Sequence, residues 1–372
     1  MNNKNKNMPK IVVIGGGVTG CGTARDLVLR GYNVVLVEFS DLGSGTSSRF
    51  HGMLQSGCRY VVSDTDYAAE CYRERKIIAD IIPDAVELIG GFFVSLPEDS
   101  DDYANEFVHA CDVAKIPCEE IKTNELLNKE KELRKNIKKA FQIPDAIINP
   151  WKLVNSLAKD IKKFGGEILS NHQVLNIKKK NKSTNVIEVY HNGIKKEIEC
   201  DGIINASGPW SGRIAKLINQ DVKLQLTKGS IIVFSHRIIN QAINRLRMPS
   251  SNDIMCPSGT VTLWGTTSEV VDDPNTTLVK PEEIQELLNG AEKLFPNAKN
   301  YRAFRAWAGV RPIVLPKEIT KGSPLPRSHS VIDHVDTEIS NMLSVCGGSL
   351  TTHRSMAEDV VNQLGNKFRI NE

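Results

Sequence analysis

One segment near the N-terminus constrains the fold of this chain more than any other. Residues 11–14 form an apolar, β-branched run typical of a buried strand, and the sequence GGGVTG follows at residues 15–20. A helical pattern over residues 21–30 ends at Gly31, and residues 34–37 then predict a second strand that stops before Glu38. A strand, a glycine turn, a helix and a strand in this order predict an α/β fold with a parallel sheet.

The glycine turn fits the G-x-G-x-x-G pattern of a dinucleotide-binding loop of the Rossmann type. In such a loop Gly15 makes the tight turn, Gly17 lets the backbone approach a pyrophosphate, and Gly20 lets the helix pack on the strand. Glu38 can accept hydrogen bonds from an adenosine ribose, which favours FAD or NAD over NADP because a carboxylate repels a 2′-phosphate. The motif alone leaves FAD and NAD open. The cofactor-binding residues that it predicts are Gly15, Gly17, Val18, Thr19, Gly20 and Glu38.

The segment after the second strand favours the longer cofactor. Residues 43–60 are rich in glycine and serine, where a NAD-binding domain would normally continue with a helix. A flexible stretch with many hydrogen-bond donors suits a long cofactor that must be threaded into the interior.

Seven short motifs, in order along the chain, carry a resemblance to a known family. They are HGMLQSGCRY at residues 51–60, GGFFVSLPED at 90–99, INASGPW at 204–210, KGS at 228–230, GTTS at 265–268, AGVRP at 308–312 and GGSLTTHR at 347–354. With them the chain resembles the D-amino-acid-oxidase-type flavoproteins. Within that group it is most similar to the catalytic subunits of anaerobic FAD-dependent glycerol-3-phosphate dehydrogenases.

The resemblance implies FAD as cofactor and a fold of two discontinuous domains. The expected FAD-binding domain is of the Rossmann type and comprises residues 10–85, 149–220 and 325–372; the expected α+β substrate domain comprises residues 86–148 and 221–324. The further cofactor-binding residues that it implies are Gly45, Thr46, Ser47, His51, Gly52, Val174, Ser207, Gly208, Trp210, Gly347, Gly348, Ser349, Leu350 and Thr351.

Local patterns agree with two domains. For the cofactor domain they predict a helix over residues 151–164, strands over 167–169 and 186–189, and a buried strand followed by a tight turn within 202–208, with a polar hairpin turn at 178–185. For the substrate domain they predict strands over 229–234 and 260–266, a helix over 281–294, and a strand pair with a helix within 86–148. Near the C-terminus, Gly347 and Gly348 are expected to open a helix that runs to about residue 363. By resemblance the positive end of this helix points at the flavin.

The implied reaction is oxidation of glycerol 3-phosphate to dihydroxyacetone phosphate, with hydride transfer to flavin N5. The residues expected to be catalytic are Arg59, Tyr60, Arg311 and His51. Arginine suits a phosphate or a carboxylate because its guanidinium binds oxyanions with two hydrogen bonds and stays charged. For a single arginine a surface salt bridge is the alternative, and Tyr60 could bond a substrate hydroxyl or simply pack. His51, His236 and His353 are candidate bases.

The last motif departs from the family pattern Gly-Gly-Lys-Leu-x-Thr-Tyr-Arg. Ser349 stands where the family has lysine, and His353 stands where it has tyrosine. The expected substrate residues are therefore Arg59, Arg311, Ser349 and His353. A missing ammonium predicts weaker binding of phosphate than in the lysine-bearing relatives. Two alternatives stay open: a flavoenzyme for another hydroxy acid or a small amino acid, and a non-catalytic subunit that holds flavin.

Composition excludes several other classes. With 47 Lys and Arg against 44 Asp and Glu in 372 residues, the net charge of +3 is too small to indicate a nucleic-acid-binding protein. No stretch approaches the roughly 20 apolar residues of a membrane span, and the polar first ten residues do not resemble a signal sequence. We therefore expect a cytoplasmic protein, with a peripheral membrane contact left open. The eight cysteines have no metal-binding spacing, so we expect reduced thiols and no metal site. The resembled subunit carries a further cysteine-bearing domain, which we do not find before Glu372. Electrons are therefore expected to pass to quinone, to oxygen or to a partner protein.

Overall fold

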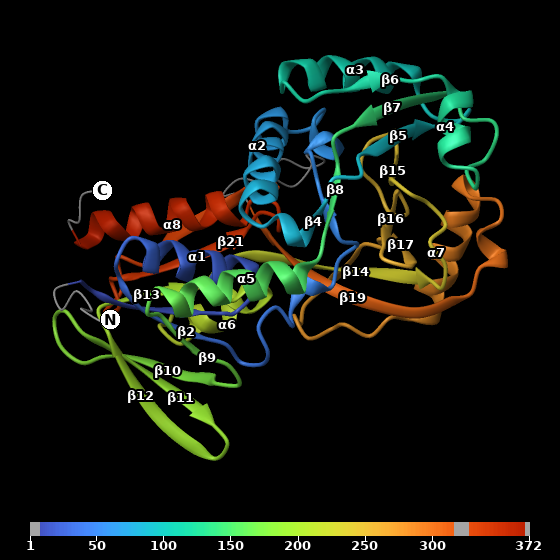
Figure 1. The fold of residues 1–372 in the computed structure, drawn as a ribbon. Helices are drawn as coiled ribbons and strands as arrows, with labels where there is room; N and C mark the ends of the chain where they lie inside the picture. The colour runs from blue at the N-terminus through green and yellow to red at the C-terminus, as the bar shows by residue number, and fades with distance from the viewer. Residues whose placement is uncertain (1–7, 316–326, 369–372) are drawn as a thin grey trace. The chain divides into compact units, whose positions relative to one another are not determined.

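The computed structural model describes residues 8–315 and 327–368, which fold into two compact units (Figure 1). Unit one comprises Met1–Ser48, Pro150–Leu226 and Arg311–Glu372, and unit two comprises Arg49–Asn149 and Thr227–Val310. Residues 49–85, which we expected in the first domain, thus belong to unit two. The expected boundary between residues 324 and 325 lies outside the described residues, as does most of the polar N-terminal tail.

Unit one is built on a six-stranded sheet in the order β20-β21-β13-β1-β2-β9. Its strands are β1 (Lys10–Ile14), β2 (Asn33–Val37), β9 (Glu167–Leu169), β13 (Gly202–Asn205), β20 (His329–Asp333) and β21 (Met342–Gly347). All neighbours in this sheet are parallel except β20 and β21. The helices of unit one are α1 (Val18–Leu29), α5 (Pro150–Lys163), α6 (Ser211–Lys216) and α8 (His353–Phe368).

Both faces of the six-stranded sheet are covered, as its nearly continuous apolar strands require. On one side α1 lies between α5 and α8 (Figure 1). On the other side lies a three-stranded antiparallel sheet of β10 (Gln173–Lys179), β11 (Asn185–His191) and β12 (Ile194–Cys200). Val12 and Ile14 of β1 share a buried cluster with Ile187 and Val189 of β11. The strand that we expected at residues 186–189 is therefore present, but it belongs to this covering sheet and not to the six-stranded one. The predicted turn at residues 178–185 joins β10 to β11.

Unit two contains a nine-stranded sheet and a small three-stranded sheet. The path of the larger sheet is β18-β14-β17-β16-β15-β5-β7-β6, with β19 paired to β14. Its strands are β5 (Gly91–Ser95), β6 (Glu119–Glu120), β7 (Lys139–Ile143), β14 (Leu224–Phe234), β15 (Ala242–Arg245), β16 (Ile254–Ser258), β17 (Val261–Gly265), β18 (Glu269–Val271) and β19 (Ala303–Val314). The small sheet consists of β3 (Met53–Leu54), β8 (Ala146–Ile148) and β4 (Val86–Glu87).

Successive side chains of β5 point to opposite faces of the larger sheet, and a helix packs on each face. The helices of unit two are α2 (Thr65–Ile81), α3 (Asp101–Val113), α4 (Thr123–Lys129) and α7 (Pro281–Leu294). Phe92 packs with Leu287 of α7, whereas the next residue, Phe93, packs with Phe107 of α3. The helix over residues 281–294 has the bounds that the sequence predicts. Within residues 8–315 and 327–368, no helix is both long and apolar enough to cross a bilayer.

Candidate cofactor site

Four of the predicted motifs lie at one edge of the six-stranded sheet. The glycine turn follows β1, Glu38 follows β2, Ser207 and Gly208 follow β13, and Gly348 follows β21. These four strands are parallel neighbours, so their carboxyl ends meet at the same edge. In open α/β sheets this edge is where ligands bind. The topology thus brings together, within unit one, segments that are up to 333 residues apart in the sequence, from Gly15 to Gly348.

Two glycines of the turn are required by contacts within the protein. Gly15 has φ +109°, and a Cβ there would lie 2.6 Å from the carbonyl oxygen of Ala206 at the end of β13. A Cβ on Gly20 would lie 1.8 Å from the carbonyl oxygen of Gly15. These positions allow α1 to pack directly against the turn that follows β1, as the motif predicts.

Gly17 is different, because the space beside it is nearly free of protein atoms. A Cβ there would meet only the hydroxyl of Ser47, at 3.1 Å. That hydroxyl accepts a hydrogen bond of 2.9 Å from the backbone N–H of Val18, at the start of α1. The first turn of α1 carries no acidic side chain. The lack of a side chain at Gly17 allows a ligand to come close to the backbone. Together with the N-terminus of α1 and the Ser47 hydroxyl, this space fits a pyrophosphate.

Glu38 is held in place by backbone donors. Its carboxylate accepts hydrogen bonds from the N–H of Gly16, at 2.6 Å, and of Ser40, at 2.7 Å. A Cβ on Gly16 would lie 2.8 Å from the Cβ of Glu38, so the absence of a side chain at the middle glycine makes room for Glu38. The sequence analysis missed this role of Gly16, although three consecutive glycines were the available signal. Burial, with the charge of Glu38 adding to it, raises the pKa of the neighbouring Cys21 thiol to about 12.

The turn after β13 is held by a buried asparagine. The side chain of Asn205 accepts a 2.6 Å hydrogen bond from the Ser207 hydroxyl and donates to the Ser344 hydroxyl of β21, at 3.0 Å. Gly208 follows with φ +56°, and no atom lies within 4 Å of where its Cβ would be. The indole of Trp210 lies against Gly45, where a Cβ would be 3.4 Å away. The turn is therefore held by side-chain hydrogen bonds and leaves open space beside Gly208.

The turn after β21 corrects one prediction. Gly347 and Gly348 have φ +81° and +65°, and neither belongs to a helix, because α8 begins only at His353. Ser349–Thr352 form a tight turn in which the N–H of Ser349 donates to the Thr352 hydroxyl. Consecutive positive φ angles are incompatible with a right-handed helix, so the helix starts later than the sequence pattern indicates.

His353 is a packing residue in this structure. Its ring is buried, its Nδ1 lies 2.8 Å from the carbonyl oxygen of Leu350, and a Cβ on Gly22 of α1 would lie 3.0 Å from the ring. Burial lowers the pKa of this imidazole to about 4, so the ring is neutral at physiological pH. The structure therefore does not support His353 as a substrate ligand or as a base. Thr351, predicted to bind cofactor, is also buried.

In unit two, Arg59 is anchored to a buried carboxylate. Its Nη2 donates to Asp253, at 3.2 Å, and to the carbonyl oxygen of Ser250, at 2.9 Å. Asp253 is fully buried and also accepts from the guanidinium of Arg247 at 2.7 Å. Arg59 makes these bonds through Nη2 alone, and its Nε and Nη1 have no partner among the described residues. The guanidinium is thus fixed at one end.

The other predicted residues are divided between the units. Tyr60 ends the short turn of Cys58–Tyr60 (η2), and its ring lies 5.8 Å from that of Tyr67. His51 accepts a hydrogen bond from the N–H of Met53, and Gly52 has φ +81°. Arg311 lies in β19 and is the first residue of its segment in unit one. We had expected Arg59 in the cofactor domain and Arg311 in the substrate domain. In the structure Arg59 lies in unit two and Arg311 in unit one.

The remaining predicted cofactor residues lie in unit one. Thr46 and Ser47 form a 3-10 turn, and Val174 on β10 packs against the cluster that covers the sheet. A group that the sequence analysis did not interpret is the buried Lys228, whose ammonium lies 2.8 Å from Glu283 and from Glu269. The signal was the KGS motif, where Ser230 donates to the same Glu283.

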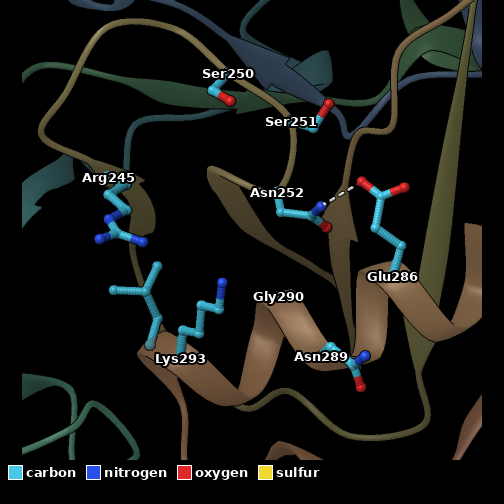
Figure 2. Close-up of a pocket in the computed structure, with 9 residues that line it drawn as sticks. Arg245, Ser250, Ser251, Asn252, Glu286, Asn289, Gly290 and Lys293 are labelled. Atoms are coloured by element: carbon cyan, nitrogen blue, oxygen red, sulfur yellow. Dashed lines mark hydrogen bonds between the residues drawn. The ribbon is translucent and has the colours of Figure 1, made fainter.

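Unit two also contains a polar cavity of about 360 Å³, lined by side chains that include Arg245, Asn252, Glu286 and Lys293. Figure 2 shows the amide of Asn252 bonded to Glu286, at 2.8 Å, with Arg245 and Lys293 apart from this pair on the left of the view. A Cβ on Gly290 would lie 2.7 Å from Asn252, so the glycine makes room for this side chain. The lining contains none of the predicted site residues.

Comparison with known proteins gives one consistent result. Residues 10–360 match the family model described as FAD dependent oxidoreductase. The anaerobic glycerol-3-phosphate dehydrogenase subunits A1 of Haloferax volcanii and A of Escherichia coli are each 34% identical over 98% of this chain, which covers 65% and 69% of their lengths. This chain thus spans about two thirds of those relatives. Among solved structures, glycine oxidase from Geobacillus kaustophilus is 18% identical and matches with a TM-score of 0.79, over 96% of this chain and 95% of that one. The glycerol-3-phosphate dehydrogenase from Bacillus halodurans complexed with FAD is 22% identical and matches with 0.74, over 99% and 66%.

Proposed function

Since this chain belongs to the family of FAD dependent oxidoreductases, we propose that it oxidises glycerol 3-phosphate to dihydroxyacetone phosphate. The observation that carries the choice of substrate is the 34% identity to anaerobic glycerol-3-phosphate dehydrogenase subunits over nearly the whole chain. We further propose that unit one holds the adenine-dinucleotide part of the cofactor and that unit two supplies Arg59 and Tyr60 to the substrate.

The residues present fit FAD. The open space beside Gly17, with the Ser47 hydroxyl and the N-terminus of α1, suits the pyrophosphate, and Glu38 is fixed where it can accept hydrogen bonds from a ribose. When bound, the flavin supplies the acceptor of a hydride from the substrate C–H. The residues of the protein bind and orient the substrate and the cofactor, and they hold protons.

Two arginines are the proposed anion ligands. Arg59 is fixed by Asp253 through Nη2, which leaves its Nε and Nη1 free to donate to a phosphate. Because a guanidinium anchored in this way loses little side-chain freedom on binding, it is already arranged for the anion. Arg311 is the second proposed ligand and Tyr60 a proposed donor to a substrate hydroxyl. Of the candidate bases we retain His51, because His353 is buried and His236 is exposed and bonded to Ser235.

Anaerobic mixing of the FAD-loaded protein with candidate substrates tests this proposal. Glycerol 3-phosphate should bleach the flavin absorbance near ~450 nm at a rate that saturates with concentration, since hydride capture reduces the ring. Glycerol without phosphate is the matched control and should react much more slowly. Lack of bleaching by glycerol 3-phosphate, with rapid bleaching by glycine or by a hydroxy acid, would contradict the proposal.

A second candidate function rests on Ser349. The resembled family has a lysine at this position, whose ammonium would add a strong charge-assisted contact with phosphate. With serine, oxidation of a small hydroxy acid or amino acid on the same fold is the alternative. The same panel of compounds distinguishes the two functions, and no bleaching by any of them would favour a flavin-holding subunit without catalysis.

The electron acceptor and the cellular location of the protein are also proposals. We propose that the reduced cofactor is reoxidised by quinone or by a partner protein in the cytoplasm, with oxygen as the alternative. The names of the relatives describe subunits, which supports a partner. Reoxidation rates of the reduced protein, measured with a soluble quinone and with air, separate these routes.

A further inference from the structure

Three cysteines from separate segments meet inside unit two. Cys58 belongs to η2, Cys111 to the last turn of α3, and Cys118 to the loop before β6. The sulfurs of Cys58 and Cys111 are 3.9 Å apart, and Cys118 packs against the same buried cluster, with its thiol interacting with that of Cys111. Cys58 and Cys111 are buried, whereas Cys118 is partly exposed. The sequence analysis interpreted all eight cysteines as inert thiols.

The end of α3 explains how Cys118 returns to Cys111. Lys115 takes a left-handed conformation with φ 55°, and the N–H of Ile116 donates to the carbonyl oxygen of Cys111 at 2.9 Å. The N–H of Lys115 donates to the carbonyl oxygen of Asp112, at 3.0 Å. These two bonds form a Schellman motif, which reverses the chain at the helix end. The same reversal of the chain places Cys118 beside the C-terminal end of α3.

We propose that these three thiols are an oxidation-sensitive site, in which Cys118 reacts with a peroxide and forms a disulfide with Cys111 that can pass to Cys58. Nothing in the proposed oxidation of glycerol 3-phosphate uses these cysteines. Intracellular disulfides are commonly transient, and an exposed thiol next to buried ones is typical of redox-sensing sites.

The chemistry balances with hydrogen peroxide as the oxidant. The Cys118 thiolate attacks one peroxide oxygen, so that an S–O bond forms, the O–O bond breaks and hydroxide leaves as water. The Cys111 sulfur then attacks the Cys118 sulfur, the S–O bond breaks and a second water leaves. In sum, two thiols and one peroxide give one disulfide and two waters. Attack of Cys58 on the Cys111 sulfur next transfers the bond and releases Cys118 as a thiolate.

The surroundings assign the order of events. The hydrogen bond from the Cys111 thiol lowers the pKa of Cys118, and the same bond, with that to Cys58 and with burial, raises the pKa of Cys111. Cys118 is therefore the group that meets the oxidant, and Cys111 reacts only with a neighbouring sulfur. Cys58 directly precedes Arg59 and Tyr60, so a disulfide between Cys58 and Cys111 ties that turn to α3.

Peptide mapping of the full, FAD-loaded chain tests the proposal. Cleavage after lysine and arginine places the three cysteines on separate peptides, residues 50–59, 77–115 and 116–122. After treatment with hydrogen peroxide and blocking of free thiols, we expect the linked pair 77–115 with 116–122, followed by the pair 50–59 with 77–115. Dithiothreitol should remove both. Before oxidation, iodoacetamide should modify Cys118 about tenfold faster than the buried Cys200.

Variants separate the three roles. Cys118→Ser should lower the yield of the 50–59 pair at least about tenfold, because the buried thiols then have no exposed entry point. Cys58→Ser should retain the other pair, and Cys200→Ser is the matched control that should change neither. The proposal is overturned if the 50–59 pair forms equally well in Cys118→Ser. It is also overturned if Cys118 of the unsubstituted protein oxidises to sulfinic acid without either linked pair.

Discussion

Replacing Gly17 and Gly20 by alanine, one at a time, should separate the binding role of the glycine turn from its packing role. Both glycines belong to the same motif, and both changes add one methyl group. At Gly20 that methyl would lie 1.8 Å from the Gly15 carbonyl oxygen, and at Gly17 it would lie 3.1 Å from the Ser47 hydroxyl. The two variants should therefore fail in different ways.

The Gly20 variant should lose stability. Ordinary contact begins near 3.4 Å, so α1 and the turn after β1 must separate by about 1.6 Å to admit the methyl group. Overpacking a close-packed site costs about 3 kcal/mol or more when backbone must move, and the helix preference of alanine offsets about 1 kcal/mol. We expect the free energy of unfolding to fall by at least about 2 kcal/mol.

The Gly17 variant should keep its fold and lose its cofactor. A contact of 3.1 Å is relieved by a few tenths of an ångström, so the free energy of unfolding without FAD should change by no more than about 0.5 kcal/mol. The methyl group would fill the space that we propose for the pyrophosphate. Loss of one hydrogen bond to a charged group costs about 1.5–3 kcal/mol, which raises the dissociation constant of FAD roughly tenfold to a hundredfold.

Urea unfolding of the cofactor-free proteins and titration with FAD measure the two effects separately. Gly212→Ala is the control, because its added methyl group would make only an ordinary contact, at 3.6 Å from the Val222 carbonyl oxygen. Ser47→Ala combined with Gly17→Ala removes the hydroxyl and should not restore FAD binding. Equal losses of stability in the Gly17 and Gly20 variants, with unchanged FAD affinity in the former, would refute the reasoning.

Three further predictions follow from single residues. Glu283→Gln should destabilise the protein at neutral pH, because contacts with Lys228 and with the backbone lower the pKa of Glu283 from 4.5 to about 2. This pKa shift corresponds to about 3 kcal/mol of folding stability, which is present above pH 4.5 and is lost as the pH falls toward 2. The urea midpoints of the two proteins should therefore converge near pH 2. Asp253→Asn should raise the KM for glycerol 3-phosphate about tenfold, because Arg59 loses its anchor, and should lower the free energy of unfolding by about 3 kcal/mol; an unchanged KM would exclude an anchored Arg59 from substrate binding. Ser349→Lys should lower that KM about tenfold, through one added charge-assisted contact, without changing the rate with an uncharged polyol; a KM that does not fall would mean that position 349 does not face the phosphate.

Local signals predicted those parts of the fold that depend on neighbouring residues. The bounds of α7, the end of α1 shortly before Gly31 and the strand before Glu38 follow from apolar periodicity, helix stop signals and the residue types at turns. The choice of FAD came from several motifs in one order along the chain, and the family match confirms it. Each of these features is readable because its cause lies within a few residues, or within one motif.

Other features depended on contacts between distant segments. Only the packed chain showed that His353 is buried against Gly22, that Asp253 anchors Arg59, and that α8 begins after the two glycines. The sequence by itself determined the cofactor class and the strand–turn–helix that opens the fold, because these follow from local backbone geometry and residue type. Tertiary structure decided which polar side chains are already engaged, because burial and partnership are set by residues that are remote in the chain and adjacent only after folding.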